Sequence, residues 1–235
     1  MQVSAIIVAS GMGTRLGGDI PKQFQLLRGK PILVHTLEAF ARADVVRHII
    51  VAVPEGYVQH TRELIANFVH SNETAARIGY SKIREIVSGG LSRADSVHIA
   101  IKQLPADTEI VLVHDGVRPF VSEKLINAVA ESAQAYGAAI AGVPLTDTLK
   151  EVNESGQITA TPDRKRFWRA QTPQGFTYEL IMKAYARGEK DGILSHVTDD
   201  SALVERLGVL VKMVEGDAGN IKITTREDLA LGEVL

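Results

Sequence analysis

Short apolar runs rich in β-branched residues alternate with longer amphipathic stretches through the first 143 residues. The runs have the length of buried strands, and the stretches between them carry apolar residues at helical spacing. This alternation predicts an α/β fold with a Rossmann-like, mostly parallel sheet flanked by helices. The expected strands are Val3–Ala9, His48–Val53, Glu85–Val87, Ile110–His114 and Ala138–Val143. The expected helices are Pro31–Arg42, Tyr57–Val69, Ser92–Leu104 and Ser122–Tyr136, with Ser92 and Ser122 as N-caps.

The pattern changes after Val143, where polar and apolar residues alternate around the turn-rich sequence Asn153–Gly156. This pattern predicts a protruding β-hairpin arm over residues 146–169, with strands at Leu149–Val152 and Gln157–Ala160. The arm has too few apolar residues for a core of its own, so we expect it to pack on a partner subunit or to fold over the site. Further along, the pattern predicts helices Tyr178–Arg187, Ser201–Leu207 and Arg226–Leu235 and a strand Leu210–Val214.

The composition narrows the class of protein. With 235 residues, 45% of them hydrophobic, we expect one domain over residues 1–235 that carries the arm as an insertion. The formal net charge of −2 gives no overall attraction to nucleic acid or anionic lipid, so an anionic ligand must meet a local group of basic side chains. The absence of cysteine excludes disulfides and cysteine nucleophiles. No apolar run approaches the ~18 residues of a membrane span and no targeting segment is expected, which favours a cytoplasmic protein.

A glycine-rich segment from Ala9 to Gly18 follows the first predicted strand. Open α/β sheets bind ligands at the carboxyl ends of their strands, and glycines let backbone amides approach phosphates closely. The segment is not a Walker loop, because no Gly-Lys-Ser/Thr follows, and it lacks the third glycine of a dinucleotide fingerprint. Taken singly, Arg15 and Lys22 are typical of a solvated surface. The glycines alone are typical of a tight turn. Together, two cations beside a glycine turn favour phosphoryl or nucleotidyl transfer.

Several motifs follow one another in a characteristic order. They are Ala9–Arg15 with Pro21–Gln23, Gly89–Ser96, Val113–Phe120, Asp147–Lys150, Gln171–Gln174 and Asn220–Thr224. The first resembles the signature of sugar nucleotidyltransferases, and the whole set resembles the 2-C-methyl-D-erythritol 4-phosphate cytidylyltransferases. The resemblance implies transfer of CMP from CTP to 2-C-methyl-D-erythritol 4-phosphate with release of pyrophosphate, in the synthesis of isoprenoid precursors. It also implies Mg²⁺ accompanying CTP and a homodimer joined through the arm.

The resemblance implies a role for each residue that matches a family motif. Catalytic roles would fall to Arg15, Lys22, Arg164 and Lys222. Nucleotide binding would fall to Ala9, Ser10, Gly11, Gly13, Gly89, Gly90, Ser96 and Asp115. The polyol phosphate would meet Asp115, Arg118, Thr148, Arg164, Thr172, Thr198 and Lys222, and the arm residues among them would reach the site of the neighbouring subunit. The sequence does not identify the protein ligands of the metal, although Asp115, at the carboxyl end of a strand, can meet a ribose hydroxyl or Mg²⁺.

Ordinary structural roles compete with several of these assignments. Ser96 is also typical of a helix surface, and Asp115 of a turn or a cap. For Arg118, an ion pair with Asp115 is the structural alternative to substrate binding. Arg164 lies within the basic cluster Asp163–Arg166, which alone indicates a solvated surface.

The remaining candidates for chemistry are expected to be structural. The seven histidines show no metal-ligand spacing, so we expect His114 to pack at the end of a strand. Trp168 is expected to anchor the return of the arm, and Glu123 and Glu131 to lie on a solvated helix face.

The chemistry inferred from this resemblance needs no strong general base. A phosphate monoester has its second pKa near ~6, so it is largely dianionic at neutral pH and can attack the α-phosphorus of CTP directly. A ribitol 5-phosphate cytidylyltransferase is the nearest alternative. A non-catalytic CTP-binding regulator is a second one, although it has no need of Arg15, Lys22 and Lys222 together. An NAD-dependent oxidoreductase is disfavoured, because Glu55 is the sole acidic residue offered after the second strand and the fingerprint is incomplete.

Overall fold

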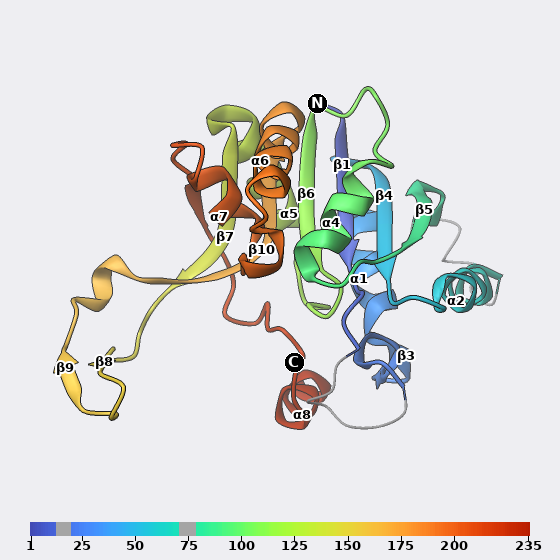
Figure 1. The fold of residues 1–235 in the computed structure, drawn as a ribbon. Coiled ribbons are helices and arrows are strands. Elements are labelled where there is room, and N and C mark those ends of the chain that lie inside the picture. Colours follow the sequence, from blue (N-terminus) through green and yellow to red (C-terminus); the bar gives the residue numbers. More distant parts are fainter. Residues whose placement is uncertain (13–19, 71–78) are drawn as a thin grey trace.

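A seven-stranded sheet with the order β11-β7-β10-β6-β1-β4-β5 forms the centre of the computed structural model, which describes residues 1–12, 20–70 and 79–235 (Figure 1). Neighbouring strands are parallel except at β10, which runs antiparallel to both β6 and β7. The expectation of an α/β fold with a mostly parallel sheet is therefore confirmed. The strands are β1 (Val3–Val8), β4 (Val46–Val53), β5 (Ile83–Ser88), β6 (Ile110–Asp115), β7 (Ala138–Pro144), β10 (Trp168–Thr177) and β11 (Lys212–Glu215).

Helices cover both faces of this sheet, because alternate strand residues point to opposite sides. In β1, Ala5 and Ile7 enter one core cluster, whereas Ile6 and Val8 enter the other. Burying each large aliphatic side chain stabilises the fold by roughly 1.5–3 kcal/mol. One face is covered by α1 (Ile32–Arg42), α2 (Val58–His70) and α5 (Glu123–Tyr136), and the other by α4 (Arg93–Ile101), α6 (Tyr178–Lys190) and α7 (Asp200–Glu205). The predicted N-caps are confirmed, since Ser92 and Ser122 accept from the backbone N–H of Asp95 and Leu125.

The local pattern did not predict β10, although this strand lies inside the sheet. Its sequence holds no apolar run, and it contains Pro173 and Gly175, residues that usually indicate an edge or a bulge. Its polar side chains are buried because they find partners inside the fold, as where the Gln171 side-chain amide donates to the carbonyl oxygen of Asp217 at 2.7 Å. Hydrogen bonds between distant segments therefore stabilise a strand that the local pattern does not indicate.

The predicted arm segment leaves the body where β7 and β10 diverge. Trp168 pairs with Pro144, and the backbone N–H of Leu145 donates to the carbonyl oxygen of Phe167 at 3.0 Å. Beyond this root lie the short antiparallel strands β8 (Glu151–Val152) and β9 (Ile158–Ala160), and the 3-10 turn η3 (Arg164–Arg166). Figure 1 shows this hairpin projecting away from the sheet. Residues 150–161 are all exposed, as the lack of a core predicts.

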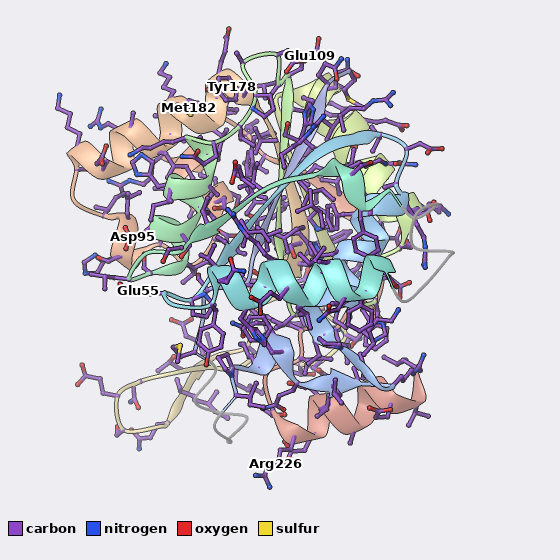
Figure 2. The ribbon with its side chains drawn as sticks, turned by 90° about the vertical axis from the view of Figure 1, so that its right-hand side faces the viewer. Glu55, Asp95, Glu109, Tyr178, Met182 and Arg226 are labelled. Carbon is purple, nitrogen blue, oxygen red and sulfur yellow. The ribbon has the colours of Figure 1, made fainter. Side chains whose placement is uncertain are left out.

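The carboxyl ends of β1 and β6 point toward the end of the molecule where the C-terminal helix α8 (Arg226–Val234) lies (Figure 1). Figure 2 places Glu109, before β6, and Arg226, on α8, at opposite ends of the molecule. The same end carries the small hairpin β2 (Leu26–Leu27) and β3 (Lys30–Pro31). The remaining 3-10 turns are η1 (Lys22–Phe24), η2 (Tyr80–Lys82) and η4 (Leu194–His196). Among the described residues, no helix is long and apolar enough to cross a membrane.

Candidate active site

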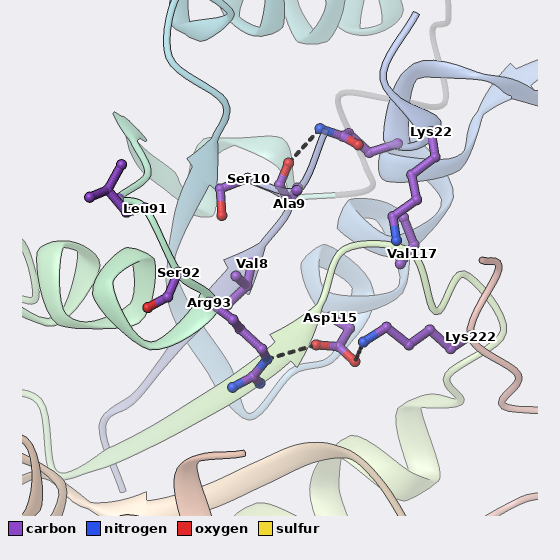
Figure 3. Close-up of a pocket in the computed structure, with 13 residues that line it drawn as sticks. Val8, Ala9, Ser10, Lys22, Leu91, Ser92, Arg93, Asp115, Val117 and Lys222 are labelled. Atoms are coloured by element: carbon purple, nitrogen blue, oxygen red, sulfur yellow. Dashed lines mark hydrogen bonds and ion pairs between the residues drawn. The ribbon is translucent and has the colours of Figure 1, made fainter. Parts of the chain in front are cut away.

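A pocket of about 180 Å³ opens at the carboxyl end of β1, between the start of the glycine-rich segment and the N-terminus of α4 (Figure 3). Ala9, Lys22 and Asp115 line it. The buried amide of Gln23 donates to the carbonyl oxygen of Ala9 at 2.6 Å, which ties η1 to the end of β1. This bond explains why the Pro21–Gln23 motif accompanies the glycines, because it holds the turn that carries Lys22 at the pocket.

A second tie joins β1 to the loop before α4. The Ser96 hydroxyl lies 2.6 Å from that of Ser10, donates to the carbonyl oxygen of Ser92 at 2.9 Å and accepts from the N–H of Gly90 at 3.1 Å. Ser96 is fully buried, so its alternative placement on the helix surface is wrong. A Cβ on Gly89 would lie 2.3 Å from the Ser10 Cβ, so only glycine permits this approach.

Asp115 ends β6 and stands at the centre of the site, with three cationic side chains around its carboxylate. Arg93 Nε lies 3.1 Å from Oδ1, whereas Lys222 Nζ and Arg118 Nε lie 3.0 Å and 3.4 Å from Oδ2. Burial opposes ionisation, but the charges of Arg93, Lys222 and Arg118 outweigh it and hold the pKa of Asp115 well below its usual range. Asp115 is therefore an anion in the folded protein, and the ion pair considered as the alternative role of Arg118 is present.

Arg93 connects this carboxylate to a second one. Its Nη1 donates to Oδ2 of Asp200 at 2.8 Å, while its Nε is held by Asp115. Burial of Arg93 opposes its charge, but the carboxylates of Asp200 and Asp115 outweigh this effect and raise its pKa. We call the group formed by Asp115, Asp200, Arg93, Arg118 and Lys222 the Asp115 junction. Its three cations and two carboxylates leave one net positive charge.

His114, next to Asp115, is a packing residue as expected, and it is fully buried against Phe40. Its Nε2 lies 3.1 Å from the carbonyl oxygen of Arg118 and must donate, so its Nδ1 accepts from the Thr172 hydroxyl at 3.0 Å. That hydroxyl in turn accepts from the N–H of Asp115 at 3.1 Å. Burial lowers the pKa of His114 to about 3, so the ring is neutral at physiological pH.

A second pocket, of about 200 Å³, adjoins the first at Asp115. Arg118, Thr172 and Thr198 line it, and it shares Arg93, Asp115 and Lys222 with the first pocket. The wall common to the two pockets is formed by Arg93, Asp115 and Lys222. Figure 3 shows these three side chains together in the first pocket.

The structure brings most of the predicted site residues to these two pockets. The first is lined by Ala9, Ser10, Gly11, Lys22, Gly90, Asp115 and Lys222, and Gly89 and Ser96 shape it from behind. Arg15 and Gly13 lie outside the described residues. Thr148 and Arg164 belong to the projecting arm, and neither pocket is lined by an arm residue in the part of the chain that the structure describes.

Sequence reasoning did not assign three residues that organise the site. Arg93 lies inside the Gly89–Ser96 motif, but its spacing gives no sign that it faces Asp115. Gln23 likewise lies inside the Pro21–Gln23 motif, but the motif assigns it no role. Asp200 follows Asp199 at the start of a helix, where acidic residues are common caps, and Asp199 does cap α7. Only the fold shows that Asp200 points inward to Arg93.

The described residues do not fit a protein-built metal cage. They contain no group of three or more His, Cys, Asp or Glu side chains arranged to hold an ion. Asp115 lines the first pocket, yet both of its oxygens are occupied by cationic side chains. Within the described ranges, a magnesium ion would therefore find no set of protein ligands ready to hold it.

Comparisons with known proteins agree with one another. The family model described as IspD, 2-C-methyl-D-erythritol 4-phosphate cytidylyltransferase, matches residues 3–235. A protein of that name from Syntrophus aciditrophicus is 44% identical over 232 residues, which cover 99% of this chain and 94% of the relative. The crystal structure of the Thermus thermophilus enzyme of that name is 34% identical with a TM-score of 0.77, covering 100% of this chain and 98% of the other. The 4-diphosphocytidyl-2C-methyl-D-erythritol synthase of Anaerococcus prevotii is 31% identical with a TM-score of 0.82, covering 99% and 95%.

Proposed function

The chain belongs to the 2-C-methyl-D-erythritol 4-phosphate cytidylyltransferase family, and from that premise we propose how its two pockets divide the reaction. The enzyme is a nucleotidyltransferase of isoprenoid precursor synthesis. The first pocket takes CTP and the second takes the polyol phosphate. The observation that carries this assignment is the shared wall of Arg93, Asp115 and Lys222, because it brings the two reactants to opposite sides of one charged junction.

On the nucleotide side, Ser10, Gly11 and Gly90 line a pocket of about 180 Å³. A small pocket bordered by glycine backbone suits a pyrimidine, and Lys22 on its wall neutralises charge on the triphosphate. We assign Arg15 to the same task by family resemblance, since the residue lies outside the described ranges.

On the acceptor side, Lys222 and Arg118 present positive charge to the incoming phosphate while Asp115 fixes both side chains. A fixed donor loses little freedom when the substrate binds, which lowers the cost of reaching the reactive geometry. Thr198, on the wall of this pocket, contributes a hydroxyl for the polyol.

The reaction is an in-line displacement. An oxygen of the acceptor phosphate forms a bond to the α-phosphorus of CTP, and the bond from that phosphorus to the α–β bridging oxygen breaks. Pyrophosphate leaves with the electron pair, and no covalent enzyme intermediate forms. Asp115 takes no proton in this step, because its depressed pKa and its three cationic partners keep it ionised. Mg²⁺, where bound together with CTP, would supply further charge neutralisation on the phosphates.

The arm acts in a homodimer. Val152, Ile158, Phe167 and Trp168 leave 39–63% of their surface exposed on the arm and its root, and such an apolar surface favours a protein partner. In the pairing we propose, Arg164 and Thr148 of one subunit reach the acceptor pocket of the other. The role of Trp168 as an anchor then falls at this interface.

The test is pyrophosphate release from CTP and Mg²⁺, with 2-C-methyl-D-erythritol 4-phosphate and ribitol 5-phosphate offered in parallel. Release with the first acceptor and a loss of at least about 100-fold in Lys22→Ala would support the assignment, since a cation lost at the phosphates weakens transition-state charge stabilisation. Release with ribitol 5-phosphate instead would assign the acceptor pocket to that polyol. CTP binding without release from either acceptor would contradict catalysis and favour a regulator.

A further inference from the structure

A continuous path of buried polar contacts runs from α6 to the active site. The Tyr185 hydroxyl donates to Oδ1 of Asp200 at 2.5 Å, and the other oxygen of Asp200 accepts from Nη1 of Arg93 at 2.8 Å. Nε of the same guanidinium donates to Oδ1 of Asp115 at 3.1 Å. The path therefore ends on the carboxylate that holds Lys222.

Asp200 and Tyr185 stand behind the site rather than in it. Their exposed fractions are 0% and 1%, and neither side chain lines the two pockets in the described part of the chain. A carboxylate removed from water costs several kcal/mol unless partners compensate it. The reaction as outlined above uses neither residue.

The charges suggest what Asp200 supplies. With Asp200 present, the guanidinium of Arg93 is shared between two carboxylates and takes only one oxygen of Asp115. The second oxygen is then left to Lys222 and Arg118. Without Asp200, an unneutralised Arg93 would compete for the whole Asp115 carboxylate and release Lys222 from its position.

We propose that Asp200 and Tyr185 are positioning residues for CMP transfer: they lock Arg93 so that Asp115 presents Lys222 and Arg118 to the acceptor phosphate. This inference rests on the proposed division of the two pockets. It assigns a measurable share of the rate to two buried residues, Asp200 and Tyr185, that touch neither reactant.

The effect should fall mainly on the acceptor. The loop that borders the CTP pocket keeps its own ties, because Ser92 and Asp95 form a capping box and Ser96 binds the Gly90 N–H. Arg93 and Lys222 line both pockets, whereas Arg118 lines the acceptor pocket alone. Loosening Arg93 therefore disturbs CTP binding less than it disturbs the side chains that face the acceptor.

Tyr185→Phe is the sharpest variant, since it removes one hydroxyl and keeps the ring that packs in the core. Tyr80 offers a matched control on the other face of the sheet. It is also buried, with 7% exposed, and its hydroxyl donates to Oε1 of Glu38 at 3.1 Å, remote from both pockets. Tyr80→Phe thus removes the same kind of bond without touching the path to Asp115.

The experiment measures CTP binding by titration and steady-state pyrophosphate release for the wild-type enzyme and both variants. We expect Tyr185→Phe to lower kcat/KM for 2-C-methyl-D-erythritol 4-phosphate about tenfold, the worth of one hydrogen bond to a charged group, with CTP affinity within about twofold. Tyr80→Phe should keep the wild-type CTP affinity and the wild-type kcat/KM for the acceptor, even if its melting temperature falls as much as that of Tyr185→Phe. Asp200→Asn should lower kcat/KM for the acceptor more than Tyr185→Phe does.

The outcomes separate this inference from the proposed function. A wild-type enzyme that releases no pyrophosphate with this acceptor would contradict the proposed function itself. An active wild-type enzyme with Tyr185→Phe no worse than Tyr80→Phe would overturn the positioning role. Equal losses for CTP binding and for the acceptor would also overturn it, because they would indicate a general loss of structure.

Discussion

The Asp115 junction and the arm carry predicted functional residues in opposite settings. At the junction, Arg93 and Asp115 are largely buried and held by several partners. On the arm, Arg164 is exposed and donates to the carbonyl oxygen of Thr146 within the arm itself. The contacts of the junction all form within one chain, whereas the role that we propose for the arm requires a partner subunit.

This contrast indicates where the stability and the activity of the enzyme are coupled. A change at the junction disturbs both, because charges there are buried and balanced. A change on the arm should disturb activity alone, because solvent surrounds the side chain and no core depends on it.

The largest effect is expected for Asp115→Asn. The amide leaves Arg93, Arg118 and Lys222 without their central anion, so we expect a loss of about 3–5 kcal/mol in unfolding free energy. Pyrophosphate release should fall about 10³-fold, since the donors facing the acceptor lose their alignment. Urea unfolding and steady-state kinetics check both values. Asp107→Asn, an exposed change in a loop, is the control and should match the wild type in each.

Arg164→Ala should separate activity from stability. We expect kcat/KM to fall about 100-fold through the lost charge-assisted contact to the acceptor phosphate, with the melting temperature unchanged. The neighbouring Arg166→Ala, also exposed on η3, is the matched control and should retain most activity. Equal losses in the two variants would point to bulk charge rather than to Arg164, and would remove the basis for the contrast.

Gly89→Ala probes the nucleotide side of the junction. Its Cβ would lie 2.3 Å from the Cβ of Ser10, so we expect CTP affinity to fall about 30-fold as the loop is forced outward. Adding Ser10→Gly removes the Ser10 Cβ and Oγ but leaves the Ser96 Oγ at 2.8 Å from the new Cβ, so it should restore only part of the affinity. A double variant as weak as the single one would argue against this close approach as the cause.

The smallest effect concerns His114 and pH. Its pKa is about 3 in the folded protein and near ~6.5 when unfolded, so only the unfolded state gains a proton as pH falls below ~6.5. Stability should therefore decrease by about 1.4 kcal/mol between pH 7.5 and pH 5.5 through this residue. His114→Gln should lack this part of the decrease in urea unfolding at the two pH values. Identical pH dependence in both proteins would contradict a buried neutral ring.

Local patterns predicted the parts of the fold that depend on local physics. β1, β4, β6 and β7 follow apolar runs, and the caps at Ser92 and Ser122 follow capping chemistry. The pattern did not predict β10, because its polar residues are satisfied by segments distant in sequence. The same limit applied at the site. Lys22 and Lys222 were recognised by family motif, whereas the contacts of Arg93 with Asp115 and Asp200 depend on three elements meeting in space.

The most direct test of the contrast between the Asp115 junction and the arm mixes two defective enzymes. Lys222→Met should disable the junction and Arg164→Ala the arm, so each should be nearly inactive alone. If an arm completes the site of its partner, a mixture allowed to exchange subunits should recover about a quarter of wild-type pyrophosphate release, because about half the dimers are mixed and each has one intact site. A mixture no more active than the average of the two separate variants would contradict an arm that acts across the dimer.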